Sequence, residues 1–172
     1  MDDARRLTDA LAGEFERRVV QESLTRILKC LDLLDVEQVW SRPNENTVSV
    51  GNLVLHLAGN LRQYVVAGLG AALDTRRRAE EFSEHGPLPT AELVERIGGT
   101  VRAAAVVVRR LEPAALLATH RVQGFEETGT SILVHVIEHF SYHTGQITYA
   151  AKTMLNVDTG YYAGQDLDQT SG

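Results

Sequence analysis

The chain has 172 residues and carries 17 Lys and Arg against 23 Asp and Glu, which gives a formal net charge of -6 at pH 7. Hydrophobic residues make up 44% and charged residues 23%, close to the average of globular proteins, so neither a disordered chain nor a fibrous repeat is indicated. Nucleic-acid-binding proteins usually present a basic face, so this acidic balance argues against nucleic acid as a partner. The length suits one compact domain over residues 1–172.

The start of the chain lacks the pattern of a secretory signal. Four of residues 1–6 are charged, no uninterrupted apolar run follows them, and no stretch approaches the length that spans a bilayer. A single cysteine, Cys30, cannot form an internal disulfide, which agrees with a reducing compartment. We therefore expect a cytoplasmic protein that has no membrane partner.

The first two expected helices lie on either side of a turn-rich stretch. From Leu7 to Leu34 an apolar residue recurs every few positions, which predicts an amphipathic helix over about 4–34. A second apolar stripe predicts a helix over about 49–69, with Ser49 as its N-cap and glycines at its end.

Two further helices are expected in the second half of the chain. The third covers about 90–111, begins at the cap Thr90 and stops before Pro113. The fourth runs over about 130–155, and Asn156 is its stop signal. No segment has a pattern that predicts a strand.

Four helices of this length predict an all-α four-helix bundle, in which sites form between facing helices. Roughly twenty residues separate the second and third helices, and at about 3.3 Å per residue they can travel back along a helix of about 30 Å. This connection therefore permits a long crossover that leaves helices 2 and 3 parallel. The connection over 113–129 holds His120 and is long enough to fold over one end of the bundle.

Three of the six histidines, His135, His139 and His143, are spaced four residues apart on the fourth expected helix. Four residues advance a helix by about 400°, so neighbouring members point nearly the same way, whereas the outer two diverge by about 80°. One helix therefore supplies two metal ligands more easily than three. His56 is the only histidine inside another expected helix, and it is the candidate third ligand.

Three neutral imidazoles at about 2.0 to 2.1 Å from a divalent metal leave one or two coordination positions open, as in catalytic sites. The reactive group would then be a metal-bound water or thiolate, because the metal lowers the pKa of either ligand. A single histidine at a helix border is usually a structural residue, but burying three on one face without partners would be costly. Gln146 and Asn60 lie about one turn after His143 and His56, where each could hydrogen-bond a ligand ring or a bound water.

Two other classes of metal site can be compared with the sequence. Ferritin-like di-iron bundles use a Glu-x-x-His pair on two helices, and no glutamate of this chain has a histidine three residues later. The string HVIEH at 135–139 matches the H-x-x-E-H pattern of the inverzincin proteases. Their usual third ligand is a downstream glutamate, and none follows Glu138. Neither class fits as well as a three-histidine site.

Two motifs taken together resemble the DinB-like superfamily: HFSYHTGQI at 139–147 and GNLVLHLAGNLR at 51–62. The similarity extends from Val39 to about Leu155 and includes the branch related to bacillithiol and mycothiol S-transferases. The resemblance implies an up-down-down-up four-helix bundle with a long crossover between helices 2 and 3, usually assembled as a homodimer.

The resemblance also implies a metal site and a reaction class. His56 corresponds to the ligand on helix 2, and His139 and His143 to the pair on helix 4, which together hold nickel, zinc or iron. His135 lies outside the usual triad, as a residue that orients or substitutes for a ligand. Characterised relatives move a low-molecular-weight thiol onto an electrophilic substrate or act on thiol adducts and isomers, which by analogy implies a metal-dependent thiol S-transferase or a related hydrolase or isomerase. The alternative is a non-catalytic metal-binding stress or scaffold protein, which a closed site that includes His135 would favour.

Overall fold

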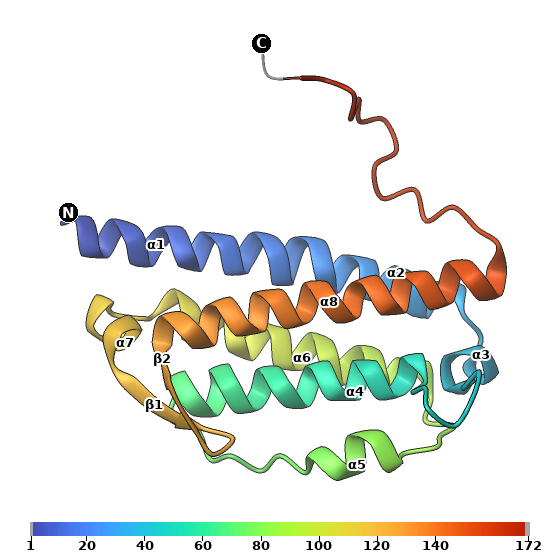
Figure 1. Ribbon diagram of the computed structural model, residues 1–172, viewed down its shortest axis with the longest axis horizontal. Coiled ribbons are helices and arrows are strands. Elements are labelled where there is room, and N and C mark those ends of the chain that lie inside the picture. Colours follow the sequence, from blue (N-terminus) through green and yellow to red (C-terminus); the bar gives the residue numbers. More distant parts are fainter. Residues whose placement is uncertain (1, 171–172) are drawn as a thin grey trace.

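The computed structural model describes residues 2–170, most of which lie in helices (Figure 1). The helical elements in chain order are α1 (Asp3–Phe15), η1 (Glu16–Leu24), α2 (Thr25–Leu33), α3 (Val36–Trp40), α4 (Val50–Leu61), η2 (Arg62–Leu69), α5 (Arg78–Ser83), α6 (Thr90–Arg109), α7 (Pro113–Leu117) and α8 (Gly129–Leu155). The two η elements are π-helical stretches that continue an α-helix. The expected helical class is confirmed, with one small β-hairpin as an exception.

The segment made of α1, η1 and α2 lies beside α8, and α4 and α6 lie next to this pair (Figure 1). Buried apolar side chains from these elements form one core, which includes Phe15, Leu57, Ile97 and Phe140. Helix α4 contacts α6, α8 and the short helix α5, so nearly all of its side chains are buried. No helix within residues 2–170 combines the length and the apolar character needed to cross a membrane.

Helix α4 begins at the N-cap that the sequence predicted. The hydroxyl of Ser49 accepts a hydrogen bond from the backbone N–H of Asn52 at 3.1 Å, and the side chain of Asn52 accepts one from the N–H of Ser49 in return. This reciprocal capping satisfies two backbone donors that the helix itself cannot use. The indole ring of Trp40 packs so close to Gly51 that a side chain at this position would collide with it.

The ends of the later helices differ in part from the sequence expectation. Thr90 was expected to cap α6, but Pro89 occupies the N-cap position and no side chain caps this helix. Helix α8 is capped by Thr128, whose side chain accepts from the N–H of Ser131 at 3.1 Å. Asn156 ends α8 in a left-handed conformation with φ 51°, as its role as a stop signal requires.

Two strands overturn the expectation that the chain has none. β1 (Thr119–Val122) and β2 (Phe125–Thr128) pair antiparallel within the connection before α8. Gln123 and Gly124 form the turn between them with φ values of 53° and 85°, the positive values that the favoured two-residue hairpin turn needs. Each strand has four residues, and over so short a stretch the alternation of apolar and polar residues that marks a strand cannot be told from the sequence of an irregular loop.

The long connection between η2 and α6 runs back along α4 and contains α5 (Figure 1). We call this connection, residues 70–89, the crossover segment. It matters for the site because it brings charged side chains from residues 74–81 against one face of α4. The other face of α4 meets α8, which carries three of the histidines.

Candidate metal centre

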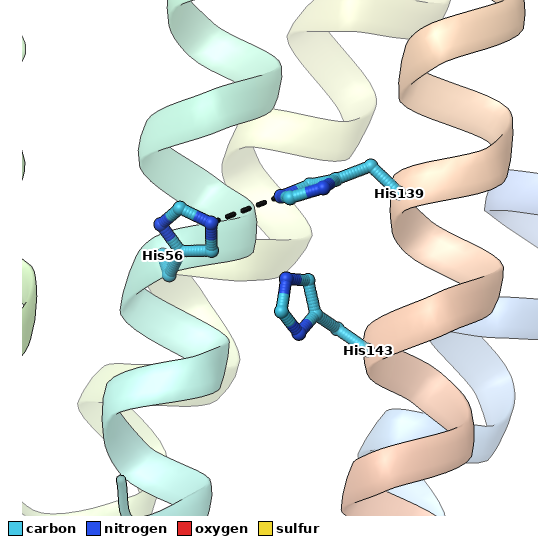
Figure 2. Close-up of side chains that lie close together, drawn as sticks. All are labelled: His56, His139 and His143. Atoms are coloured by element: carbon cyan, nitrogen blue, oxygen red, sulfur yellow. Dashed lines mark hydrogen bonds between the residues drawn. The ribbon is translucent and has the colours of Figure 1, made fainter. Parts of the chain in front are cut away.

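The rings of His56 on α4 and of His139 and His143 on α8 point toward one another across the gap between the two helices (Figure 2). One nitrogen of each ring lies within 4.8 Å of the others, and the Nε2 atoms of His56 and His139 are 3.0 Å apart. Two ligand atoms at about 2.0 to 2.1 Å from a tetrahedral ion lie about 3.3 Å from each other. Small side-chain shifts would therefore let the three imidazoles hold one divalent ion.

His139 and His143, the two histidines of α8 in the cluster, are neutral near pH 7. Burial lowers the pKa of His139 to about 3, and the neighbouring imidazoles of His143 and His56 add to this effect. Burial also lowers the pKa of His143. An imidazole must be neutral to bind a metal, so these rings offer lone pairs without first releasing a proton.

Gln146 contacts the ring of His143 one turn further along α8. Its Oε1 lies 2.6 Å from Nδ1 of His143, and its Nε2 donates to the hydroxyl of Tyr142 at 3.3 Å. Because an amide oxygen only accepts hydrogen bonds, Nδ1 of His143 carries the proton and Nε2 keeps its lone pair. Figure 2 shows this Nε2 on the side of the ring that faces the other two histidines.

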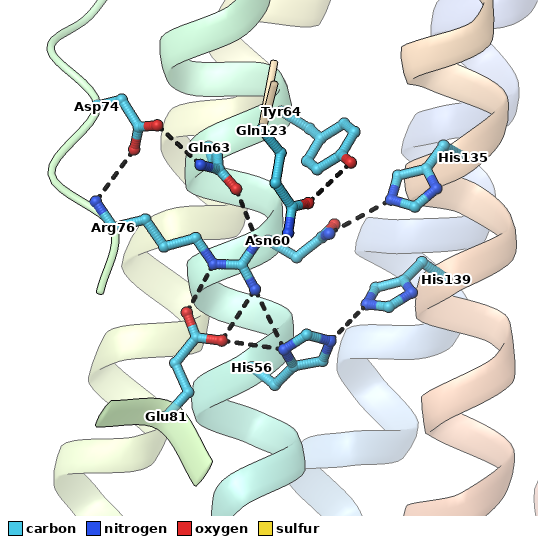
Figure 3. A network of polar contacts seen from close by, with 10 residues as sticks. All are labelled: His56, Asn60, Gln63, Tyr64, Asp74, Arg76, Glu81, Gln123, His135 and His139. Atoms are coloured by element: carbon cyan, nitrogen blue, oxygen red, sulfur yellow. Dashed lines mark hydrogen bonds and ion pairs between the residues drawn. The ribbon is translucent and has the colours of Figure 1, made fainter. Parts of the chain in front are cut away.

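Glu81 contacts the ring of His56 from the crossover segment (Figure 3). Its Oε2 lies 2.9 Å from Nδ1 of His56, and both side chains are almost completely buried. Sequence reasoning missed this residue, because it stands in a short charged run that has the appearance of a solvated surface. A carboxylate partner of this kind is common behind histidines that bind metals.

Arg76 holds the carboxylate of Glu81 with two parallel contacts. Its Nε lies 2.7 Å from Oε1 and its Nη2 lies 2.9 Å from Oε2, and only 3% of its side chain is exposed. Burial alone would raise the pKa of Glu81, but the hydrogen bonds from Arg76 and His56 outweigh it and leave this pKa below its ordinary value. Glu81 is therefore ionised at neutral pH.

Comparison with known proteins agrees with the geometry of the site. The sequence model that describes the DinB superfamily matches residues 20–147, a range that includes all three converging histidines. The chain belongs to the DinB superfamily. No curated protein and no solved structure matches it at a significant level. The donor set of this DinB protein fits a divalent transition metal, because imidazole nitrogens from three histidines on two facing helices lie within 4.8 Å of one another.

His135 of the DinB protein lies next to the three converging rings but is not part of their cluster. Its ring stacks on Tyr64 with centroids 4.3 Å apart, and its Nε2 lies 3.3 Å from Nδ2 of Asn60. Tyr64 in turn donates to Gln123 in the hairpin turn at 2.9 Å (Figure 3). The structure thus joins Asn60 to His135, and the Oδ1 atom of Asn60 has no hydrogen-bond partner within residues 2–170.

The remaining candidates lie elsewhere in the DinB protein. Nε2 of His120 lies 3.0 Å from the carbonyl oxygen of Ala115, and His85 is exposed on the crossover segment. Cys30 is completely buried. Two cavities of about 460 and 420 Å³ lie beside α5 and between η1 and α8, and neither is lined by the converging histidines.

Proposed function

We propose that this DinB protein binds one nickel, zinc or iron ion on His56, His139 and His143 and uses it to act on a low-molecular-weight thiol. The observation that carries the proposal is the convergence of three imidazole nitrogens within 4.8 Å on two facing helices. When bound, the metal would act as a Lewis acid toward a thiol or a water molecule. The reaction class would be thiol transfer to an electrophilic substrate, or a related hydrolysis or isomerisation.

The number of converging ligands supports a catalytic role. The cluster contains three histidines, and His135 does not complete it as a fourth. Three protein ligands leave the metal open to a further ligand, whereas four would close the site. The non-catalytic alternative is a metal-carrying stress or scaffold protein, and the observation that favours it is that none of the three histidines lines either of the two cavities described above.

The proposal includes the up-down-down-up bundle of the superfamily and its assembly as a homodimer. The crossover that runs back along α4 supports this bundle topology (Figure 1). Tyr142 and Tyr149 support the homodimer, because both lie on α8 with 62% and 75% of their surface exposed, and exposed aromatic residues are enriched at interfaces. Sedimentation equilibrium would measure the assembly directly.

The function is tested by the consumption of small thiols. The protein is loaded with nickel, zinc or iron(II) in turn and given a panel of thiols together with a chromogenic electrophile such as 1-chloro-2,4-dinitrobenzene. We expect a rate above the uncatalysed reaction for the wild type and for the control His85→Ala, and no such rate for His143→Ala. A protein that retains its metal but consumes none of the thiols would contradict the catalytic proposal and support the metal-carrying alternative.

A further inference from the structure

We propose that Glu81, held in place by Arg76, is a positioning residue that fixes the proton of His56 on Nδ1 and thereby presents Nε2 to the metal. The proposal rests on the proposed metal function and adds to it a charged pair from the crossover segment. It also distinguishes two of the proposed ligands by the group that orients each ring. A carboxylate orients His56, whereas an amide oxygen orients His143.

The contacts around Nδ1 of His56 determine where its proton lies. Oε2 of Glu81 is 2.9 Å from this atom and Nη2 of Arg76 is 3.1 Å from it. Oε2 also accepts from the same Nη2 at 2.9 Å, so one carboxylate oxygen lies within reach of both donors. A guanidinium has donors only and a carboxylate has acceptors only. With the proton on Nδ1, His56 donates to Oε2 of Glu81, whereas without it two acceptor atoms would face each other at 2.9 Å. Nη2 of Arg76 is used by its own bond to Oε2, and Nε2 of His56 is left to accept from Nε2 of His139 at 3.0 Å.

Burial protects the contact between His56 and Glu81 from competition with water. The side chains of His56 and Glu81 are 8% and 9% exposed, so little water can replace the contact. Arg76 balances the charge of the carboxylate, and its Nη1 donates to Oε1 of Gln63 at 2.8 Å. Gln63 donates in turn to Asp74 at 2.8 Å, which ties the start of the crossover to the π-helical continuation of α4 (Figure 3). The carboxylate is thus held from behind before any metal binds.

A glycine of α4, Gly59, leaves space for the carboxylate of Glu81. Gly59 lies three residues after His56 and therefore on the same face of the helix. A Cβ atom at position 59 would overlap Oε1 of Glu81 and would lie 3.2 Å from Nε of Arg76. A glycine in the middle of a helix is normally unfavourable. Here it permits the close approach of Glu81, which supports a specific role for this contact.

The tautomer of His56 can be measured in the metal-free protein. Long-range ¹H–¹⁵N correlation spectra at pH 8 distinguish an imidazole protonated on Nδ1 from one protonated on Nε2. We expect the Nδ1–H form in the wild type and in the control Glu80→Gln, which changes an exposed neighbour on the same helix. Glu81→Gln should keep this form, because an amide oxygen can also accept from Nδ1. Glu81→Ala and Gly59→Ala should shift the population toward the Nε2–H form.

Metal affinity supplies the second measurement, with cobalt(II) as the probe in competition with a coloured chelator. Loss of the partner of a ligating histidine typically weakens metal binding about 10- to 100-fold. We expect a loss of this size for Glu81→Ala, a smaller loss for Glu81→Gln, and the wild-type affinity for Glu80→Gln. The amide of Glu81→Gln rescues the hydrogen bond but not the charge, so its intermediate position separates the two contributions.

Unchanged tautomer and unchanged cobalt affinity in Glu81→Ala, with the circular dichroism of the wild type, would overturn the proposal. If Glu81→Ala loses its helical signal, Gly59→Ala decides in its place, because it displaces the carboxylate without removing it. If the wild type binds no cobalt, the proposed metal function fails. The spectra of the metal-free protein still decide then whether Glu81 sets the tautomer of His56.

Discussion

Oε1 of Gln146 lies 2.6 Å from Nδ1 of His143, the ring nitrogen on the side away from His56 and His139. We predict that Gln146→Ala weakens metal binding about tenfold, the lower end of the range for such partners because this contact is exposed. Titration with cobalt(II) against a chelator measures the change. The control Tyr142→Phe removes only the hydroxyl that accepts from Gln146, so its affinity should equal that of the wild type. An unaltered affinity in Gln146→Ala would show that the contact does not orient the ring.

Acid should destabilise the metal-free protein through His139. Its pKa is about 3 in the folded state, against about 6.5 for an unperturbed histidine, so between these values the unfolded state binds more protons. The contribution of His139 to the free energy of unfolding is therefore largest above about pH 6.5, and it decreases as the pH falls toward about 3. Thermal denaturation between pH 7.5 and pH 4 should show this decrease, and a shallower one in His139→Asn. Identical pH profiles for the two proteins would contradict the assignment.

His135 should be dispensable for metal binding. Its Nε2 contacts Asn60 and its ring stacks on Tyr64, so we predict that His135→Ala retains the metal content of the wild type. The free energy of unfolding should fall by about 1 kcal/mol, the net value of one hydrogen bond. Loss of the metal from a folded His135→Ala protein would place this histidine among the ligands instead.

The packing behind the site should contribute much of the stability. Phe140 directly follows His139 on α8 and is completely buried in the core. We predict that Phe140→Ala lowers the free energy of unfolding by about 3 to 5 kcal/mol. The control Val134→Ala, at a residue of the same helix that is 52% exposed, should change it by less than about 0.5 kcal/mol. Urea denaturation measures both values, and equal effects would contradict the packing described for α8.

The sequence was sufficient to predict the long helices and to select three histidines that meet in space. Apolar residues at helical spacing lie inside α8 and the other long elements, because a long amphipathic pattern has few alternative structures. The four-residue spacing of His139 and His143 places both on one helix face, and the structure brings His56 to the same point. Helical geometry alone was enough for the pair on α8.

Periodic patterns in the sequence could not predict contacts between residues that are far apart in the chain. Glu81 follows His56 by 25 positions and lies on a helix of six residues, which has too few turns for a periodic signal. The hairpin before α8 was missed for a similar reason. Gly59 was the one available signal, since a glycine in the middle of an apolar helix indicates that another group approaches closely.

The central claim is that His56, His139 and His143 hold one metal ion. Plasma mass spectrometry of the purified protein, beside the double variant His139→Ala and His143→Ala and the control His85→Ala, tests it most directly. The account predicts about one equivalent of nickel, zinc or iron in the wild type and the control, and none in the double variant, as expected for a single three-histidine site. Absence of metal from all three proteins after supply of nickel, zinc and iron, or an equal content in the double variant, would contradict it.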